Sequence, residues 1–227
     1  MAPFMIAITG GTGSGKSTLA EALHARLSQR GCAIVTEDNY YLPRTDHTPP
    51  VVGWPNEWVE REINFDDPAT KDMAMFRQQL VSLREGRAIL QPVYDFATHE
   101  RLAGRTLEIT PEAFVIVEGV HVLSDPGFAE CFDLSVYVDA PADIRLIRRL
   151  RRDRDERGRD IERTIGQYLT FARDAHERFT EPAKSICDLV SSEPGEPACS
   201  GSGPNQEVTE ALVAPVWERL GELGALD

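Results

Sequence analysis

A glycine-rich segment near the start of the chain has the residue types and spacing of a phosphate-binding loop. From position 10 it reads Gly-Gly-Thr-Gly-Ser-Gly-Lys-Ser, which fits the pattern G-x-x-x-x-G-K-[ST]. In such a loop, backbone N–H groups cradle the phosphates of a nucleoside triphosphate, the lysine contacts the β- and γ-phosphates, and the next hydroxyl ligates Mg²⁺. The alternative is an ordinary turn between a strand and a helix. The candidate residues are Gly10, Gly11, Thr12, Gly13, Ser14, Gly15, Lys16, Ser17 and Thr18.

Two acidic residues, Asp38 and Glu118, follow apolar runs that are typical of buried strands. Phosphoryl transfer needs a metal ion and a base aligned with the acceptor hydroxyl, and in a doubly wound sheet such groups lie at the carboxyl ends of strands. Either residue could instead be part of a solvated turn or a helix cap. We favour function for both, with Glu118 holding Mg²⁺ directly or through water. In Asp66-Asp67-Pro68, helix capping accounts for Asp67, whereas the local pattern leaves the role of Asp66 open.

Basic residues are concentrated in one segment of an acidic chain. Nine arginines lie between Arg145 and Arg163, although the formal net charge of the whole chain is -13. A helix through this segment would place Arg149 and Arg152 on one stripe with Arg145. Three interpretations are open, namely a nucleic-acid-binding helix, a salt-bridged solvated surface, and a lid that closes over a triphosphate. With a phosphate loop upstream, we favour the lid. Part of an apolar side would be formed by Ile144, Ile147 and Leu150.

Apolar runs alternate with helical patterns, which indicates a parallel sheet covered on both faces. We predict an α/β fold of P-loop NTPase type, with a doubly wound, mainly parallel five-stranded sheet, helices on both faces and an Arg-rich lid. One domain would span residues 1–227, with the lid at roughly 141–163 and an acceptor-side loop at roughly 39–66. The predicted strands are residues 4–8, 32–36, 113–117, 134–138 and 187–190. The predicted helices are one ending before Gly31, one from 67 to about 85, one from Pro141, and residues 161–179 and 208–220, with a loop at 193–204.

Composition and absent motifs exclude several classes of protein. The net charge of -13 repels a phosphate backbone, so we expect no binding to nucleic acid or to an anionic membrane. The sequence lacks the N-K-x-D motif of GTPases and the L-S-G-G-Q segment of transporter ATPases. It also lacks an apolar run of the ~20 residues needed to span a bilayer, a signal peptide and closely spaced cysteines. We expect a cytoplasmic protein with reduced thiols, and a kinase that acts on a small acceptor.

Further short motifs follow the phosphate loop in order. They are Asp38-Asn-Tyr-Tyr41, Asn64-Phe-Asp66-Asp-Pro68, Pro92-Val-Tyr94-Asp-Phe96 with His99, Glu118-Gly119, Val138-Asp139, Arg148-Arg149, Glu156-Arg-Gly-Arg159 and Gln167-Tyr168. Each motif is weak alone, but the ordered set is highly specific. From about Phe4 to Val190, the chain resembles the uridine/cytidine kinase family within the phosphoribulokinase-like P-loop kinases.

The resemblance implies a reaction and roles in it. Asp38 would accept the proton of a nucleoside 5′-hydroxyl as that hydroxyl attacks the γ-phosphate of ATP. Ser17 and Glu118 would position Mg²⁺, and Arg152 and Arg157 would be the lid arginines on the phosphates. The implied cofactors are ATP and Mg²⁺, and the implied assembly is a homotetramer. The implied catalytic residues are Lys16, Asp38, Arg152 and Arg157.

The resemblance also implies how the nucleoside is held. Asp66, Arg149 and Gln167 would hold the ribose, with Asp66 accepting hydrogen bonds from its vicinal hydroxyls. Tyr94 and His99 would contact the 4-position of the pyrimidine. The implied substrate-binding residues are Asp66, Tyr94, His99, Arg149, Arg159 and Gln167.

Two segments depart from the family pattern. Residues 42–61 form a long stretch that contains four prolines as well as Trp54 and Trp58, and residues 191–203 lack the usual Arg-Gly pair near the adenine.

We predict a uridine/cytidine kinase of pyrimidine salvage. One alternative is a related kinase for a sugar phosphate or a vitamin-like alcohol, against which the spacing of Tyr94 and His99 argues. The other is a nucleotide-binding regulator that has lost catalysis.

Overall fold

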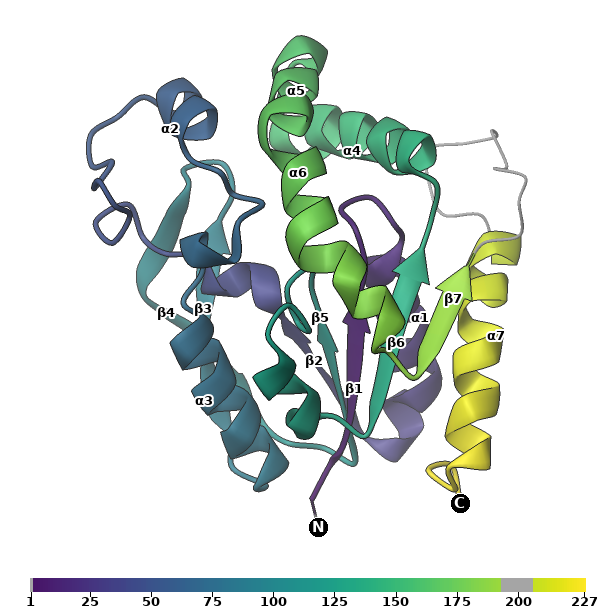
Figure 1. Ribbon diagram of the computed structural model, residues 1–227. Helices are drawn as coiled ribbons and strands as arrows, with labels where there is room; N and C mark the ends of the chain where they lie inside the picture. Colours follow the sequence, from purple (N-terminus) through teal and green to yellow (C-terminus); the bar gives the residue numbers. More distant parts are fainter. Residues whose placement is uncertain (1, 193–205) are drawn as a thin grey trace.

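The computed structural model describes residues 2–192 and 206–227 of the chain. A five-stranded parallel sheet with strand order β2-β5-β1-β6-β7 lies at its centre (Figure 1). The strands are β1 (Phe4–Thr9), β2 (Cys32–Thr36), β5 (Phe114–Glu118), β6 (Leu134–Asp139) and β7 (Leu189–Ser192). The predicted five-stranded α/β sheet is therefore confirmed, although its last strand begins at Leu189 rather than at position 187.

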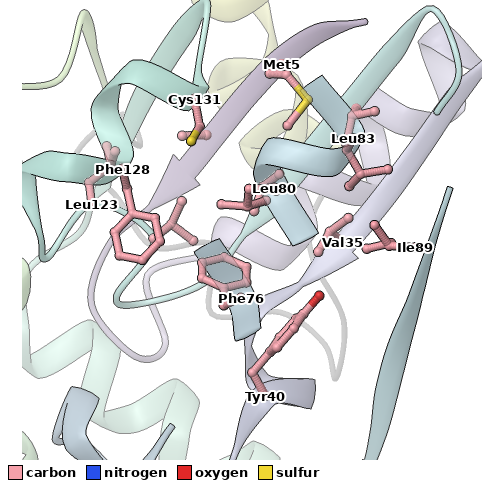
Figure 2. Packing of buried hydrophobic residues seen from close by; sticks show 14 of the residues in the cluster. Met5, Val35, Tyr40, Phe76, Leu80, Leu83, Ile89, Leu123, Phe128 and Cys131 are labelled. Carbon is pink, nitrogen blue, oxygen red and sulfur yellow. The ribbon is translucent and has the colours of Figure 1, made fainter. Parts of the chain in front are cut away.

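Helices cover both faces of the sheet, and alternate residues of each strand pack on opposite faces. The covering helices are α1 (Lys16–Leu27), α3 (Met73–Arg84) and α7 (Gln206–Glu222). On one face, Ile6 of β1 is buried in a cluster with side chains of α1 and α7. On the other face, Met5 belongs to a cluster with side chains of α3. Figure 2 shows this second cluster, in which the rings of Tyr40 and Phe76 meet edge to face at 4.8 Å between centroids.

The helix expected from position 67 begins later than predicted. Asp67 does act as a cap, but only for a short 3-10 turn, Pro68–Thr70. The chain then passes through Lys71, which forms an isolated antiparallel bridge with Tyr41, and Asp72 caps α3. The prediction is wrong here because pairing with a distant segment interrupts the helix between two local caps.

A β-hairpin beside the main sheet was not predicted. It consists of β3 (Ile89–Asp95) and β4 (Glu100–Ile109), which form a two-stranded antiparallel sheet. Most residues of β4 are exposed, so the strand lacks the apolar run of a buried strand, and β3 contains Pro92, which argues against a central strand. The segment 39–66, predicted as a loop, contains the helix α2 (Asn56–Glu62).

The Arg-rich segment forms a helix whose buried side is charged. Helix α4 (Ala142–Arg157) lies across the carboxyl ends of the strands, above the phosphate loop (Figure 1). Its buried residues include Arg145 and Arg149, whereas Ile147 is 46% exposed. The predicted stripe therefore does face inward, but the predicted apolar side does not pack into a core. The apolar side stays outside a core because α4 covers the polar edge of the sheet rather than one of its apolar faces.

Helical structure resumes after α4 and continues as predicted for residues 161–179. It comprises α5 (Ile161–Gln167), a π-helical turn (Tyr168–Ala172), α6 (Arg173–Ala175) and a second π-helical turn (His176–Thr180). The predicted loop at 193–204 lies outside the described residues. None of the described helices is long and apolar enough to cross a membrane. The described cysteines, Cys32, Cys131 and Cys187, are free thiols, as expected.

Candidate active site

The phosphate loop connects β1 to α1, as the sequence predicts. Gly13 has a φ of +76°, and a Cβ atom there would overlap the backbone carbonyl of Arg145 in α4, so only glycine fits. Lys16, at the start of α1, is buried. The buried hydroxyl of Ser14 has no hydrogen-bond partner among the described residues. Such a concave loop with an unsatisfied donor and a helix N-terminus suits a polyphosphate.

The two predicted metal ligands lie side by side. Glu118 is the last residue of β5. The parallel pairing of β5 with its two neighbours places Glu118 beside Ile8 of β1 and Thr36 of β2. The hydroxyl of Ser17 donates a 3.0 Å hydrogen bond to Oε2 of Glu118. Burial of Glu118 raises the pKa of its carboxyl group. A carboxylate and a hydroxyl at this spacing are the hard oxygen ligands that Mg²⁺ prefers.

Asp38 lies in a short 3-10 turn, Glu37–Tyr40, directly after β2. Its Oδ1 atom is 2.8 Å from Nζ of Lys71, a residue that the sequence analysis did not select. Burial acts to raise the pKa of Asp38, but Lys71 and Lys16 overcome this effect and hold that pKa well below its usual range. Asp38 is therefore an ionised carboxylate. It can accept a hydrogen bond from the hydroxyl group to which a phosphoryl group is transferred.

One pocket connects the phosphate loop with the predicted substrate-binding residues. Aromatic rings of Tyr41, Phe65 and Phe96 contribute to its wall. Ser17 and Glu118 lie outside its lining, as do the loop residues other than Thr12 and Lys16. The predicted residues that line it are Thr12, Lys16, Asp38, Asp66, Tyr94, His99, Arg149, Arg152, Arg157, Arg159 and Gln167.

Asp66, whose role the local sequence left open, forms a two-pronged ion pair with Arg149. Nη1 of the arginine lies 3.0 Å from Oδ1 of Asp66, and Nη2 lies 3.2 Å from Oδ2. Asp66 comes from the segment before α3 and Arg149 comes from α4, so the pair joins two sides of the pocket. A carboxylate held in this way presents a fixed acceptor at the pocket wall.

The unpredicted hairpin carries Tyr94 and His99. Tyr94 is 5% exposed, and its hydroxyl has no hydrogen-bond partner among the residues described by the structure. His99, in the turn between the two strands, stacks on Phe65 with 5.0 Å between ring centroids. A buried polar atom without a partner costs stability unless a ligand or water satisfies it. The Tyr94 hydroxyl is thus suited to hydrogen-bond a bound molecule.

Glu60 of α2, also missed by the sequence analysis, organises several of these groups. Its Oε1 atom is 2.7 Å from Nε2 of His99 and 3.1 Å from Nε of Arg159, and its backbone carbonyl accepts a 2.9 Å bond from the Gln167 amide. Burial acts to raise the pKa of Glu60, but His99 and Arg159 hold it below its usual value. An ionised carboxylate only accepts hydrogen bonds, so Nε2 of His99 carries the proton.

Asp153 is a third residue that the sequence analysis missed, and it contacts four arginines of the pocket. It is fully buried in α4. Its carboxylate oxygens lie 2.8 Å from Arg152, 3.5 Å from both Arg157 and Arg159, and 3.7 Å from Arg149. The signal was present in the sequence, because an acid four residues after Arg149 and four before Arg157 lies on the same face of a helix.

We expect Asp153→Ala to destabilise the protein strongly. Removing one partner from a buried ionic cluster typically costs about 3–5 kcal/mol, because it leaves charges buried without compensation. The measurement is the free energy of unfolding from urea titration. Asp155→Ala is the matched control in the same helix, since the pair that Asp155 forms with Arg154 is exposed to solvent. Equal stability of the two variants would contradict the role given to Asp153.

A family model described as "Phosphoribulokinase / Uridine kinase family" matches residues 5–196 of the chain. This chain belongs to the phosphoribulokinase/uridine kinase family. Curated relatives in the family cover nearly its whole length. It is 37% identical over 220 residues to the uridine kinase of Clostridium perfringens (strain SM101 / Type A), covering 97% of this chain and 98% of the relative. It is 40% identical over 221 residues to the uridine kinase of Clostridium botulinum (strain Kyoto / Type A2), with the same coverage.

Solved structures of other proteins have a fold similar to that of this chain. A structure from Silicibacter sp. TM1040 has a TM-score of 0.68 at 24% identity, covering 83% of this chain and 89% of that chain. The D-glycerate 3-kinase from Cryptococcus neoformans var. grubii has a TM-score of 0.55 at 16% identity, covering 79% of this chain and 80% of that chain. At these identities the similarity concerns the fold alone.

Proposed function

We propose that this chain transfers the γ-phosphoryl group of ATP to the 5′-hydroxyl of uridine, cytidine or both, giving UMP or CMP and ADP. One observation carries the proposal, namely that a single pocket joins Lys16 and Asp38 to the Asp66–Arg149 pair and the Tyr94 hydroxyl. A phosphate site, a base and a recess with polar groups for a sugar and a ring are thus adjacent. The near full-length similarity to proteins named uridine kinase supports the same acceptor.

Residues of the phosphate loop would hold ATP, and Ser17 and Glu118 would hold Mg²⁺. The buried, unsatisfied Ser14 hydroxyl and the Ser17–Glu118 contact fit this use. When bound, Mg²⁺ neutralises charge on the phosphates. Among the described residues, no group of three or more His, Cys, Asp or Glu side chains is placed to hold a metal ion. We assign the ion to the end of the phosphate loop, where the Ser17–Glu118 contact would place it beside the bound phosphates.

The reaction can be derived from the side chains around Asp38. Its carboxylate accepts the proton of the 5′-hydroxyl while the hydroxyl oxygen forms a bond to the γ-phosphorus and the bond to the ADP oxygen breaks. Lys16, Arg152 and Arg157 supply positive charge to the transferred group. We further propose that residues 141–163 act as the lid, since α4 supplies both arginines and packs against the phosphate loop.

The nucleoside would fill the remainder of the pocket. Asp66, held by Arg149, accepts hydrogen bonds from the ribose hydroxyls, and Gln167 lines the same pocket. Tyr94 and His99 contact the pyrimidine, and Arg159 borders it. Since Nε2–H of His99 donates its hydrogen bond to Glu60, the other ring nitrogen is left for the pyrimidine. The homotetramer implied by the family resemblance remains a prediction.

An acceptor screen with coupled detection of ADP tests this proposal. With Mg-ATP, we expect turnover with uridine or cytidine and background rates with sugar phosphates and vitamin-like alcohols. Turnover with one of those acceptors alone would favour the related-kinase alternative. Absence of turnover with every acceptor, despite ATP binding, would favour a regulator and contradict the proposal.

A further inference from the structure

A buried lysine links the proposed base to a second carboxylate. Nζ of Lys71 lies 2.8 Å from Oδ1 of Asp38 and 2.8 Å from Oε1 of Glu37. The side chains of Lys71 and Glu37 are completely buried, whereas that of Asp38 is 32% exposed and lines the pocket. Lys71 itself does not line the pocket. It therefore contacts the base from behind, on the side away from the space that a substrate would occupy.

The backbone on both sides of Lys71 is fixed by hydrogen bonds to the segment after Asp38. The N–H of Leu42 donates to the carbonyl of Thr70 at 2.9 Å, and the N–H of Asp72 donates to the carbonyl of Tyr40 at 2.8 Å. The ammonium group also lies 4.4 Å from the centroid of the Tyr41 ring. The lysine is consequently held with little freedom relative to the turn that carries Asp38.

Glu37 is fixed by the loop that follows Glu118. Its Oε2 atom accepts a 3.1 Å hydrogen bond from the backbone N–H of His121. It packs so closely against Gly119 that a Cβ atom there would overlap the Glu37 carboxylate. Glu37 thus anchors Lys71 to the end of β5, the same strand whose last residue is the proposed metal ligand. Base and metal site are connected through this buried pair.

We propose that Lys71 is a positioning residue for phosphoryl transfer: it holds one carboxylate oxygen of Asp38, leaving the other for the acceptor hydroxyl, and Glu37 keeps it in place. This inference rests on the proposed function, in which Asp38 is the base. An aspartate without such a partner can rotate about its side-chain bonds, and misplacement by about 1 Å can cost about 10²-fold in rate. The negative charge of Glu37 balances the positive charge of Lys71. The group formed by Asp38, Glu37 and Lys71 therefore retains one negative charge, which the base needs.

Three variants separate positioning from folding. Lys71→Met removes the ammonium group but leaves Glu37 buried without its partner, so it is expected to lower both kcat and the melting temperature. Glu37→Gln combined with Lys71→Met removes both buried charges with side chains of similar shape. We expect this neutral pair to recover much of the melting temperature but not kcat, which stays about 10- to 100-fold below wild type. The affinity for ATP is expected to be unchanged, and Lys71→Arg should retain more of kcat than Lys71→Met does.

A double-mutant cycle tests whether Lys71 acts through Asp38. On an Asp38→Asn background, adding Lys71→Met should lower the residual kcat no further, because the group that it positions is already lost. An equal fractional loss on both backgrounds, or a wild-type kcat in the neutral pair, would overturn the inference. Equal losses for Lys71→Arg and Lys71→Met would also overturn it. If the wild-type protein itself showed no turnover of uridine or cytidine, the proposed function would fail instead.

Discussion

Asp38→Asn should lower kcat for uridine by about 10²- to 10⁴-fold, the range expected when a general base is removed. Asparagine keeps the size of the side chain but cannot take a proton, and the phosphate loop, to which we assign ATP binding, is left intact. The measurement combines steady-state kinetics with ATP titration of the same preparation, and the affinity for ATP is expected to be unchanged.

The matched control is Asp46→Asn, which changes an exposed aspartate a few residues further along the chain. It should leave both kcat and the affinity for ATP at wild-type values. A wild-type kcat in Asp38→Asn would remove Asp38 as the base, and with it the derivation of the reaction from this pocket. Loss of ATP binding in Asp38→Asn would show instead that the residue serves the nucleotide.

A second large effect is expected on the discrimination between ribonucleosides and deoxyribonucleosides. We expect kcat/KM for 2′-deoxyuridine to be lower than that for uridine by as much as ~10⁴, because sites that hydrogen-bond a hydroxyl leave buried polar groups unpaired when it is missing. Here the group that loses its hydrogen-bond donor would be Asp66, which Arg149 holds at the pocket wall with three hydrogen bonds. Competition kinetics with the two nucleosides measures the ratio directly.

Asp66→Ala should remove most of this discrimination by lowering kcat/KM for uridine much more than that for 2′-deoxyuridine. Asp67→Ala is the neighbouring control, since Asp67 caps a short turn and does not line the pocket. It should leave the ratio between the two nucleosides unchanged. If Asp66→Ala kept the full ratio, the ribose hydroxyls would have to be recognised by other residues.

Local patterns were sufficient to predict the central sheet and the phosphate loop. The strands are continuous apolar runs, and the loop motif lies between the first of them and an amphipathic helix, so pattern and context agree. The β3–β4 hairpin does not show such a run, because most of β4 is exposed. The start of α3 depends on the bridge between Lys71 and Tyr41, which no local signal reports.

The site residues that were not predicted from the sequence also depend on contacts between distant parts of the chain. Glu60 contacts Arg159, which is 99 positions away in the sequence, and Lys71 contacts Asp38 across 33 positions. Such pairs form only when the fold brings their elements together, so neither residue has a local signature. The predicted pocket residues were found because their motifs matched a family pattern in order. Asp153 is different, since its spacing from Arg149 and Arg157 was visible along one helix.

In the proposed reaction, this pocket phosphorylates the 5′-hydroxyl of a pyrimidine ribonucleoside. Phosphorus NMR of the product formed from uridine and Mg-ATP tests it most directly. The predicted result is a phosphomonoester signal split by the 5′ protons of the ribose, appearing together with ADP. A phosphate attached at the 2′ or 3′ position, or release of inorganic phosphate with uridine unchanged, would rule out transfer to the 5′-hydroxyl.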